Sequence, residues 1–164
     1  MIELIVLDVD GCLSDGKITY DENGVEYKSF DVKDGLGIAT WIRMGKKVAI
    51  ITGRESLIVK KRANELKIPY LFQGIKNKKE KLDFVIKDMN ISYENVAAIG
   101  DDLNDFAMLK SAGLSFCPNN AVDEIKGIVD IVLSKNGGDG AIREMIEIIL
   151  QKENLKQRFL QEWI

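Results

Sequence analysis

The stretch LIVLDVDG, residues 4–11, is an apolar run that ends in two aspartates and a glycine. A continuous run of branched apolar residues is typical of a strand that is buried on both faces, as in a parallel sheet. Asp8 and Asp10 follow with one residue between them. Two like charges beside a buried strand cost free energy unless a cation or a proton compensates them. The stretch therefore predicts a central strand with a charged site at its carboxyl end.

Outside this stretch, the sequence alternates short apolar runs with segments of helical periodicity. The runs that predict further strands are KVAIITG (47–53), YLFQG (70–74), NVAAIGDD (95–102), LSFC (114–117) and DIVLS (130–134). The segments that predict helices are 33–45, 55–68, 78–90, 103–113, 121–128 and 139–154. Such alternation is typical of a parallel sheet with helices on both faces. We expect an α/β protein with a Rossmann-like parallel sheet.

The chain of 164 residues has the length of one domain, and no linker rich in Pro, Ser or Gly divides it. We therefore expect a single domain over residues 1–164. Residues 17–30 predict a β-hairpin flap, because apolar runs flank the turn sequence DENG. The tail at 151–164 carries an apolar stripe, which either packs on the body of the protein or forms a subunit contact or a lid. The stripe consists of Leu155, Phe159, Leu160 and Trp163.

Composition excludes several classes of function. The net charge of −3 disfavours nucleic acid and anionic membranes as partners, and no apolar run approaches the ~20 residues of a membrane span. No basic leader precedes the first apolar run, so we expect a cytoplasmic protein. The absence of histidine excludes Ser-His-Asp and Cys-His catalysis and the common zinc sites. We expect both cysteines, Cys12 and Cys117, to be reduced and partly buried.

Polar residues follow four of the predicted strands, and ligands bind at the carboxyl ends of strands in open α/β sheets. Oxygen ligands alone select Mg²⁺, which would also compensate the like charges. One carboxylate of the first pair can attack phosphorus, and the other can protonate the leaving group. A hydroxyl and an ammonium can hold the phosphoryl oxygens. The residues are Asp8, Asp10 and Gly11; Thr52, Gly53 and Arg54; Lys78; and Gly100, Asp101, Asp102, Asn104 and Asp105.

Simpler roles are open for the single residues. Asp102, Asp105 and Thr52 are residue types that cap helices or form turns, and Lys78 belongs to the lysine-rich stretch KNKKEK (76–81). Response-regulator receivers use similar residues. In receivers, however, the acceptor aspartate lies on a central strand and the lysine comes last. Here the acidic pair comes first and an acidic cluster follows the lysine, which disfavours a receiver.

Four ordered motifs resemble those of the haloacid dehalogenase superfamily of phosphatases: DVDG (8–11), ITGR (51–54), the lysine after the third strand, and GDDLND (100–105). The resemblance implies that Asp8 is the nucleophile and Asp10 the general acid and base. It also implies a set of ligands. Phosphate would be bound by Thr52, Gly53 and Lys78. Mg²⁺ would be bound by Asp8, the backbone carbonyl of Asp10, and Asp101. Asp102 and Asp105 would lie around these metal ligands without binding the ion themselves.

Most members of this superfamily carry a cap domain, but only 41 residues separate Asp10 from Thr52 and 25 separate Thr52 from Lys78. Neither gap has room for a cap beyond the hairpin. The sequence resembles a capless, tetrameric branch, which implies a homotetramer where one subunit's hairpin covers the next subunit's site and a C-terminal segment helps to close it. The shared stretches are DGCLSDGKITYDENG (10–24), KSFDVKDGLGI (28–38), TGRESLIVKKRANELKI (52–68), LFQGIKNK (71–78) and NGGDGAIRE (136–144).

The branch implies a phosphorylated sugar acid as the substrate, with 3-deoxy-D-manno-octulosonate 8-phosphate, a precursor for lipopolysaccharide, favoured by Arg54 and Glu65. The alternatives are a nine-carbon sialic-type sugar acid 9-phosphate, or a catalytically silent binding subunit with the same fold. A guanidinium pairs bidentately with a carboxylate, so Arg54 or Arg62 can bind the acid group of the substrate, although Arg62 can equally be a surface charge. Lys33, in VKDG, is a further candidate for contact with the sugar.

Overall fold

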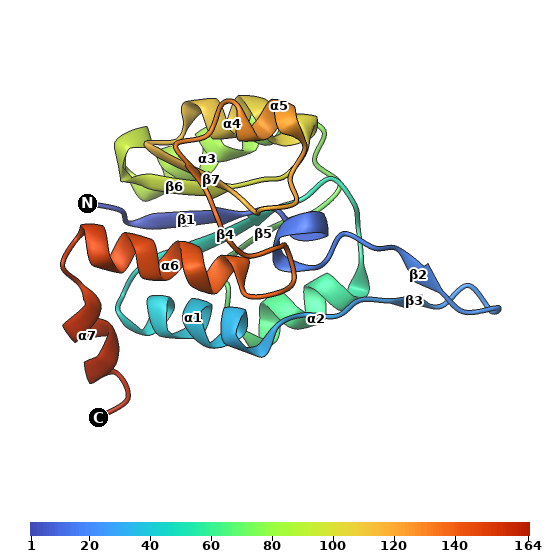
Figure 1. Cartoon of the computed structure of the whole chain (residues 1–164), viewed down its shortest axis with the longest axis horizontal. Helices are drawn as coiled ribbons and strands as arrows, with labels where there is room; N and C mark the ends of the chain where they lie inside the picture. The colour runs from blue at the N-terminus through green and yellow to red at the C-terminus, as the bar shows by residue number, and fades with distance from the viewer.

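Six parallel strands form one sheet in the order β5-β4-β1-β6-β7-β8 (Figure 1). The computed structural model describes residues 1–164. The strands are β1 (Leu4–Leu7), β4 (Lys47–Ile51), β5 (Tyr70–Phe72), β6 (Val96–Ile99), β7 (Leu114–Cys117) and β8 (Ile131–Val132). The predicted α/β fold with a parallel sheet is confirmed, with β1 at its centre.

Helices cover both faces of the sheet (Figure 1). One face carries α1 (Val32–Arg43), α2 (Leu57–Glu65), α6 (Ala141–Lys152) and α7 (Lys156–Gln161), and the other carries α3 (Lys78–Met89), α4 (Phe106–Ser111) and α5 (Asp123–Lys126). Ile5 and Leu7 of β1 pack in the first layer, and Leu4 and Val6 pack in the second. Successive side chains of a strand point to opposite faces, so a strand between two layers needs an unbroken apolar run.

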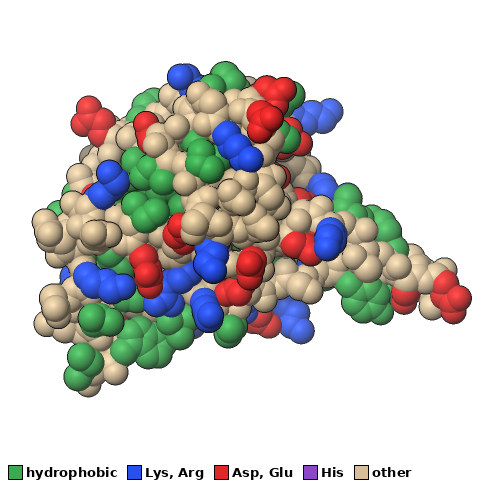
Figure 2. Space-filling model, in the orientation of Figure 1, with side chains coloured by type: hydrophobic (Ala, Val, Ile, Leu, Met, Phe, Trp, Pro, Cys, Tyr) green, Lys and Arg blue, Asp and Glu red, His purple; other side chains and the backbone are tan.

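The predicted hairpin forms between β2 (Thr19–Tyr20) and β3 (Glu26–Tyr27), and it projects from the body as a narrow arm (Figure 1). Apolar side chains lie exposed along this arm (Figure 2). They are Ile18, Tyr20, Val25 and Tyr27. No cap domain accompanies the hairpin. None of the helices combines the length and the hydropathy that crossing a membrane requires.

The C-terminal segment folds back towards α1. Phe159 is buried in the core of this face, and Trp163 Nε1 donates to Thr40 Oγ1 at 3.1 Å. The Arg43 guanidinium lies over the Trp163 ring, 4.7 Å from its centroid. Leu160 and Trp163 stay about half exposed. Of the two predictions for the tail, this conformation shows packing on the body of the chain.

The first strand ends at Leu7, before the aspartates, and Val9–Leu13 form a wide helical turn. Gly11 permits this turn, since its φ of 94° lies in the left-handed region. A Cβ at Gly11 would also lie 2.0 Å from Asp101 Oδ2. The turn therefore brings the DVDG motif directly against the end of β6.

A buried carboxylate, Asp34, links α1 to α6. Its side chain accepts the backbone N–H of Arg143 in the first turn of α6 at 2.7 Å, and Oδ2 has no partner. Burial raises the pKa of Asp34 to about 6, more than the hydrogen bond from Arg143 lowers it. The loop before α6 contacts the turn that contains DVDG, where the Gly138 N–H donates to the Cys12 carbonyl at 3.1 Å. Asp34 therefore anchors a helix whose preceding loop supports this turn.

We predict that replacing Asp34 with asparagine will flatten the pH dependence of stability. The folded state holds the proton of Asp34 more tightly than the unfolded state does, so the protonated side chain stabilises the fold. This stabilisation is complete below about pH 4 and is lost as the pH rises through about 6. The shift corresponds to about 3 kcal/mol. The introduced asparagine keeps an acceptor for Arg143 and cannot ionise. Between pH 4 and 8, the free energy of unfolding should therefore decrease by about 3 kcal/mol less in the variant than in the wild type.

Urea unfolding of both proteins across this pH range measures the difference. Asp123 is an exposed carboxylate on α5, so Asp123→Asn should follow the wild-type curve. Parallel curves for Asp34→Asn and the wild type would show that Asp34 does not titrate in the folded protein.

Candidate active site

Asp8 lies at the carboxyl end of the central strand β1. Its backbone N–H donates to Ile99 O at 3.2 Å, which continues the pairing of β1 with β6. The residue is 4% exposed, and its Oδ1 accepts from Lys78 Nζ at 2.6 Å. Because β4 and β6 pair with β1 on either side, their ends meet at the same edge of the sheet.

Lys78, at the start of α3, bridges two buried carboxylates. Its Nζ donates to Asp8 Oδ1 and to Asp105 Oδ1, both at 2.6 Å. Burial lowers the pKa of Lys78, but the charges of Asp8 and Asp105 raise it by more, so the pKa lies above its ordinary value. The lysine is therefore a buried ammonium of the site, and the simpler reading of Lys78 as a solvated surface charge is wrong.

Asp105 organises the loop that follows β6. It is fully buried, and its Oδ2 accepts the backbone N–H groups of Asp101 and Asp102 at 3.0 and 3.4 Å. A Cβ at Gly100 would lie 2.4 Å from the Asp105 Cβ, so the backbone approaches this side chain closely. Asp105 thus orients the loop that carries Asp101, and Asp102 is the residue before the short helical turn Leu103–Asp105.

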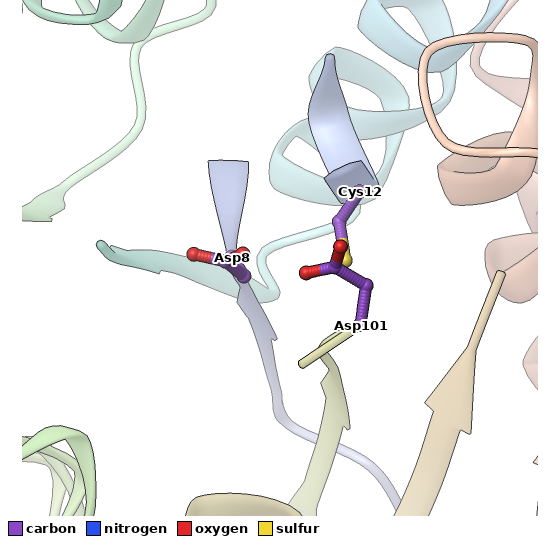
Figure 3. A group of neighbouring side chains, drawn as sticks. All are labelled: Asp8, Cys12 and Asp101. Carbon is purple, nitrogen blue, oxygen red and sulfur yellow. The ribbon is translucent and has the colours of Figure 1, made fainter. Parts of the chain in front are cut away.

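The site has more negative than positive charge. Asp101 faces Asp8 beside the Cys12 thiol (Figure 3), and Asp101 makes no ion pair with a lysine or arginine. Burial raises the pKa of Asp101 to about 8, helped by the charge of Asp8. Burial and the charge of Asp105 raise the pKa of Asp8 to about 6 although Lys78 opposes the shift. The carboxylates of Asp8, Asp101 and Asp105 surround the single ammonium of Lys78, so a further cation would reduce the excess of negative charge.

The donor set fits Mg²⁺. Carboxylate oxygens of Asp8 and Asp101 lie within 4.8 Å of one another and of the Cys12 Sγ. Mg²⁺ prefers such oxygen ligands. Burial raises the pKa of Cys12 well above its usual value, so the thiol stays protonated and is a poor metal ligand. Asp8 and Asp101 are therefore the side chains that would hold the ion. Cys12 and Cys117 are free, as predicted, and are buried completely rather than partly.

A polar cavity of about 270 Å³ opens beside this cluster. It brings together eight of the predicted site residues and adds Gly16, and Thr52 is only 2% exposed at the end of β4. The residues that line it are Asp8, Asp10, Gly16, Thr52, Gly53, Arg54, Asp101, Asp102 and Asn104. Gly16 is the only lining residue outside the predicted site.

Two predicted substrate-binding residues lie outside this cavity. Lys33 lines a separate polar hollow between the starts of α1 and α6. Arg62 lines a hollow between the hairpin base and α2, where its guanidinium lies 5.8 Å from the Phe30 ring centroid and Nη1 lies 3.5 Å from Glu65 Oε2. Within one chain, neither side chain reaches the Asp8 cleft.

The hairpin contributes a residue that sequence reasoning missed. Lys28 Nζ lies 2.5 Å from Asp10 Oδ1 and 3.4 Å from Glu26 Oε1. The sequence contains one indication of this role. Side chains alternate between the two faces of a strand, so Glu26 and Lys28 are expected on the same face of the returning segment of the hairpin.

The loop before α6 also contributes to the site. A Cβ at Gly137 would lie 1.8 Å from the Gly11 carbonyl oxygen, so only glycine allows the loop to close on the DVDG turn. The NGGDG stretch therefore forms the wall behind this turn.

Comparison with known proteins finds relatives over most of the chain. The sequence profile of the haloacid dehalogenase-like hydrolases matches residues 71–146. The 3-deoxy-D-manno-octulosonate 8-phosphate phosphatase KdsC of Haemophilus influenzae is 39% identical over 158 residues, which are 96% of this chain and 88% of that protein. KdsC of Escherichia coli is 41% identical over 149 residues, which are 91% of this chain and 79% of that protein.

Solved structures agree with these relatives. The Moraxella catarrhalis 3-deoxy-D-manno-octulosonate 8-phosphate phosphatase, crystallised with a magnesium ion, a phosphate ion and KDO, matches with a TM-score of 0.95 at 39% identity, covering 99% of this chain and 94% of that chain. The cobalt-bound form of the Haemophilus influenzae enzyme matches with a TM-score of 0.88 at 41% identity, covering 92% and 88%. The similarity therefore extends over both sequence and fold.

Proposed function

Because the chain belongs to the haloacid dehalogenase-like hydrolases, in the family of 3-deoxy-D-manno-octulosonate 8-phosphate phosphatases, we propose that it hydrolyses this sugar-acid phosphate with Mg²⁺. This membership confirms the resemblance predicted from the four motifs. The observation that carries the proposal is the meeting of Asp8, Asp101 and Lys78 at the edge of the sheet beside the polar cavity. The protein is accordingly a phosphoric monoester hydrolase.

In the proposed reaction, Asp8 and Asp10 each act twice. A carboxylate oxygen of Asp8 attacks phosphorus, an Asp8–phosphate bond forms, and the bond from phosphorus to the sugar oxygen breaks. Asp10 donates a proton to that departing oxygen and then takes a proton from the water that attacks the aspartyl-phosphate. Asp8 is thereby regenerated, and inorganic phosphate leaves.

The other groups stabilise charge on the phosphoryl oxygens. The Lys78 ammonium, the Thr52 hydroxyl and the backbone N–H of Gly53 are the donors for these oxygens. Mg²⁺, when bound by Asp8, the Asp10 carbonyl and Asp101, supplies further positive charge that lets a phosphate dianion approach a carboxylate. Asp105 keeps Lys78 and the Asp101 loop in place through its hydrogen bonds.

The proposal includes a homotetramer in which the hairpin of one subunit covers the cavity of the next and a C-terminal segment helps to close it. Exposed apolar side chains on the arm, such as Tyr20 and Val25, and at Leu103 and Phe106 beside the cavity support such a contact. Exclusion of water favours phosphoryl transfer. Cytoplasmic localisation and a role in lipopolysaccharide precursor synthesis, both implied by the resemblance, belong to the same proposal.

The acid group of the substrate needs a cationic partner. Arg54 lines the cavity itself. Arg62 and Lys33, which lie outside the cavity of their own chain, would reach the sugar only when subunits assemble. The Nε of Arg62 is buried without a partner, which supports its use in binding a carboxylate.

We predict the highest kcat/KM for 3-deoxy-D-manno-octulosonate 8-phosphate. The value should exceed that for the nine-carbon 9-phosphate by about tenfold or more. It should exceed that for glucose 6-phosphate by about a hundredfold, because glucose 6-phosphate offers no carboxylate to the guanidinium of Arg54 in the cavity. Phosphate release is the measurement, and EDTA should stop it. A higher value for the nine-carbon substrate would favour that alternative, and no release from any of the three would indicate a silent binding subunit.

A further inference from the structure

We propose that Lys28 is the positioning residue of the general acid. In this proposal the ammonium of Lys28, carried by the hairpin, holds the Asp10 carboxyl group through Oδ1 towards the hairpin side of the cleft and away from the Asp8–Asp101 pair. The inference rests on the proposed function, in which Asp10 protonates the departing sugar oxygen. The hairpin of each subunit would then position a residue in its own site as well as cover the site of a neighbouring subunit.

The contact between Lys28 and Asp10 joins the hairpin to the catalytic turn. Lys28 Nζ donates to Asp10 Oδ1 at 2.5 Å, and the lysine side chain is 1% exposed whereas the aspartate side chain is 22% exposed. A buried ammonium loses its hydration and is stable only where carboxylates replace the water. The lysine is thus tied to Asp10 on the inner side, while Asp10 keeps access to the cavity.

The opposite oxygen of Asp10 has a cation as well. Arg54 Nε lies 3.8 Å from Asp10 Oδ2, and Arg54 Nη2 donates to Glu26 Oε1 at 2.9 Å. Glu26 Oε2 accepts from Ser56 Oγ at 2.9 Å. These five residues (Asp10, Glu26, Lys28, Arg54 and Ser56) form the hairpin-base cluster, in which two acids and two cations balance. The hydrogen bond from Ser56 and the charge of Lys28 hold the pKa of Glu26 below its ordinary value although burial opposes this.

Asp10 needs such restraint because of its neighbours. It follows Asp8 by two residues, and the Asp8–Asp101 pair would share a cation that attracts any further carboxylate. An Asp10 side chain drawn onto that cation would stay ionised and would have no proton to give to the leaving group. Lys28 provides the competing attraction, and its 2.5 Å contact is much closer than the 3.8 Å approach of Arg54.

The test compares two leaving groups. A sugar alkoxide needs a proton when it departs, whereas p-nitrophenolate needs almost none. In Lys28→Met, the single-turnover rate at which the sugar-acid 8-phosphate releases its sugar should fall by about a hundredfold, the lower end of the usual contribution of a general acid. This rate reports the formation of the aspartyl-phosphate and excludes its later hydrolysis, in which Asp10 acts as a base on either substrate. KM should change by less than about threefold, and the single-turnover release of p-nitrophenolate should also fall by less than about threefold. Lys28→Arg, which keeps the charge, should recover most of the loss.

Two further variants separate the possible causes. Asp10→Asn should show the same dependence on the leaving group, and Lys47→Met, which removes an exposed lysine at the opposite end of β4, should behave like the wild type. If Lys28→Met proves poorly folded by circular dichroism, Lys28→Gln retains a donor of similar length and receives the same assays.

The results decide as follows. Equal losses on both substrates in the Lys28 variants, or no loss on either, while Asp10→Asn depends on the leaving group, would overturn the role of Lys28 and leave the proposed function intact. An Asp10→Asn variant without such dependence would overturn the role of Asp10, and the inference with it.

Discussion

Replacing Asp8 with asparagine should reduce phosphate release by roughly four orders of magnitude or more, because the amide oxygen is not a nucleophile and no aspartyl-phosphate can form. The introduced asparagine is nearly isosteric and can still accept the hydrogen bond that Lys78 Nζ donates to Asp8 Oδ1 at 2.6 Å. The fold should therefore persist, and the loss should lie in kcat. Phosphate release under single-turnover conditions is the measurement.

The matched control is Asp123→Asn, which removes one exposed carboxylate from α5 and should retain wild-type turnover. Circular dichroism of both variants checks the fold. An Asp8→Asn enzyme that keeps more than about a hundredth of the wild-type kcat would contradict the assignment of Asp8 as the nucleophile.

Replacing Lys78 with methionine should both destabilise the protein and abolish its activity. The change leaves Asp8 and Asp105 buried without their shared ammonium, and breaking a buried ion pair in this way costs about 3–5 kcal/mol. The melting temperature should fall by roughly 10 °C for a domain of this size. The phosphoryl oxygens also lose a cationic donor. Urea unfolding and phosphate release are the two measurements.

Lys76→Met provides the comparison, because Lys76 is an exposed lysine two residues away. It should unfold within about 0.5 kcal/mol of the wild type, as surface substitutions usually do. A Lys78→Met protein as stable as Lys76→Met would mean that the two carboxylates do not depend on this ammonium.

The positions of the strands and of the reacting groups could be predicted because both depend on local patterns. An apolar run between two helical layers identifies β1, and the polar residues directly after β1, β4 and β6 include Asp8, Thr52 and Asp101. Parallel strands bring their carboxyl ends to one edge of the sheet, so residues far apart in sequence meet without further information.

The hairpin base could not be predicted in the same way. Period 2 places Glu26 and Lys28 on one face of a strand, but it does not say whether that face meets water or the catalytic turn. The contact of Lys28 with Asp10, 18 residues apart, depends on how the hairpin folds back over the end of the sheet. Arg62 and Lys33, in contrast, were predicted to bind substrate from their residue types, but the fold places both outside the cavity.

By itself, then, the sequence determined the parallel α/β fold, and it predicted that Asp8, Thr52, Lys78 and Asp101 would meet at the carboxyl edge of the sheet. Only the tertiary structure decided that Lys78 is a buried bridge between Asp8 and Asp105, that Lys28 contacts Asp10, and that Asp34 accepts a hydrogen bond from the first turn of α6. The physical reason is that hydrophobic periodicity reports which face of an element is buried. An ion pair or a buried hydrogen bond instead depends on distances between atoms of elements that are far apart in the chain.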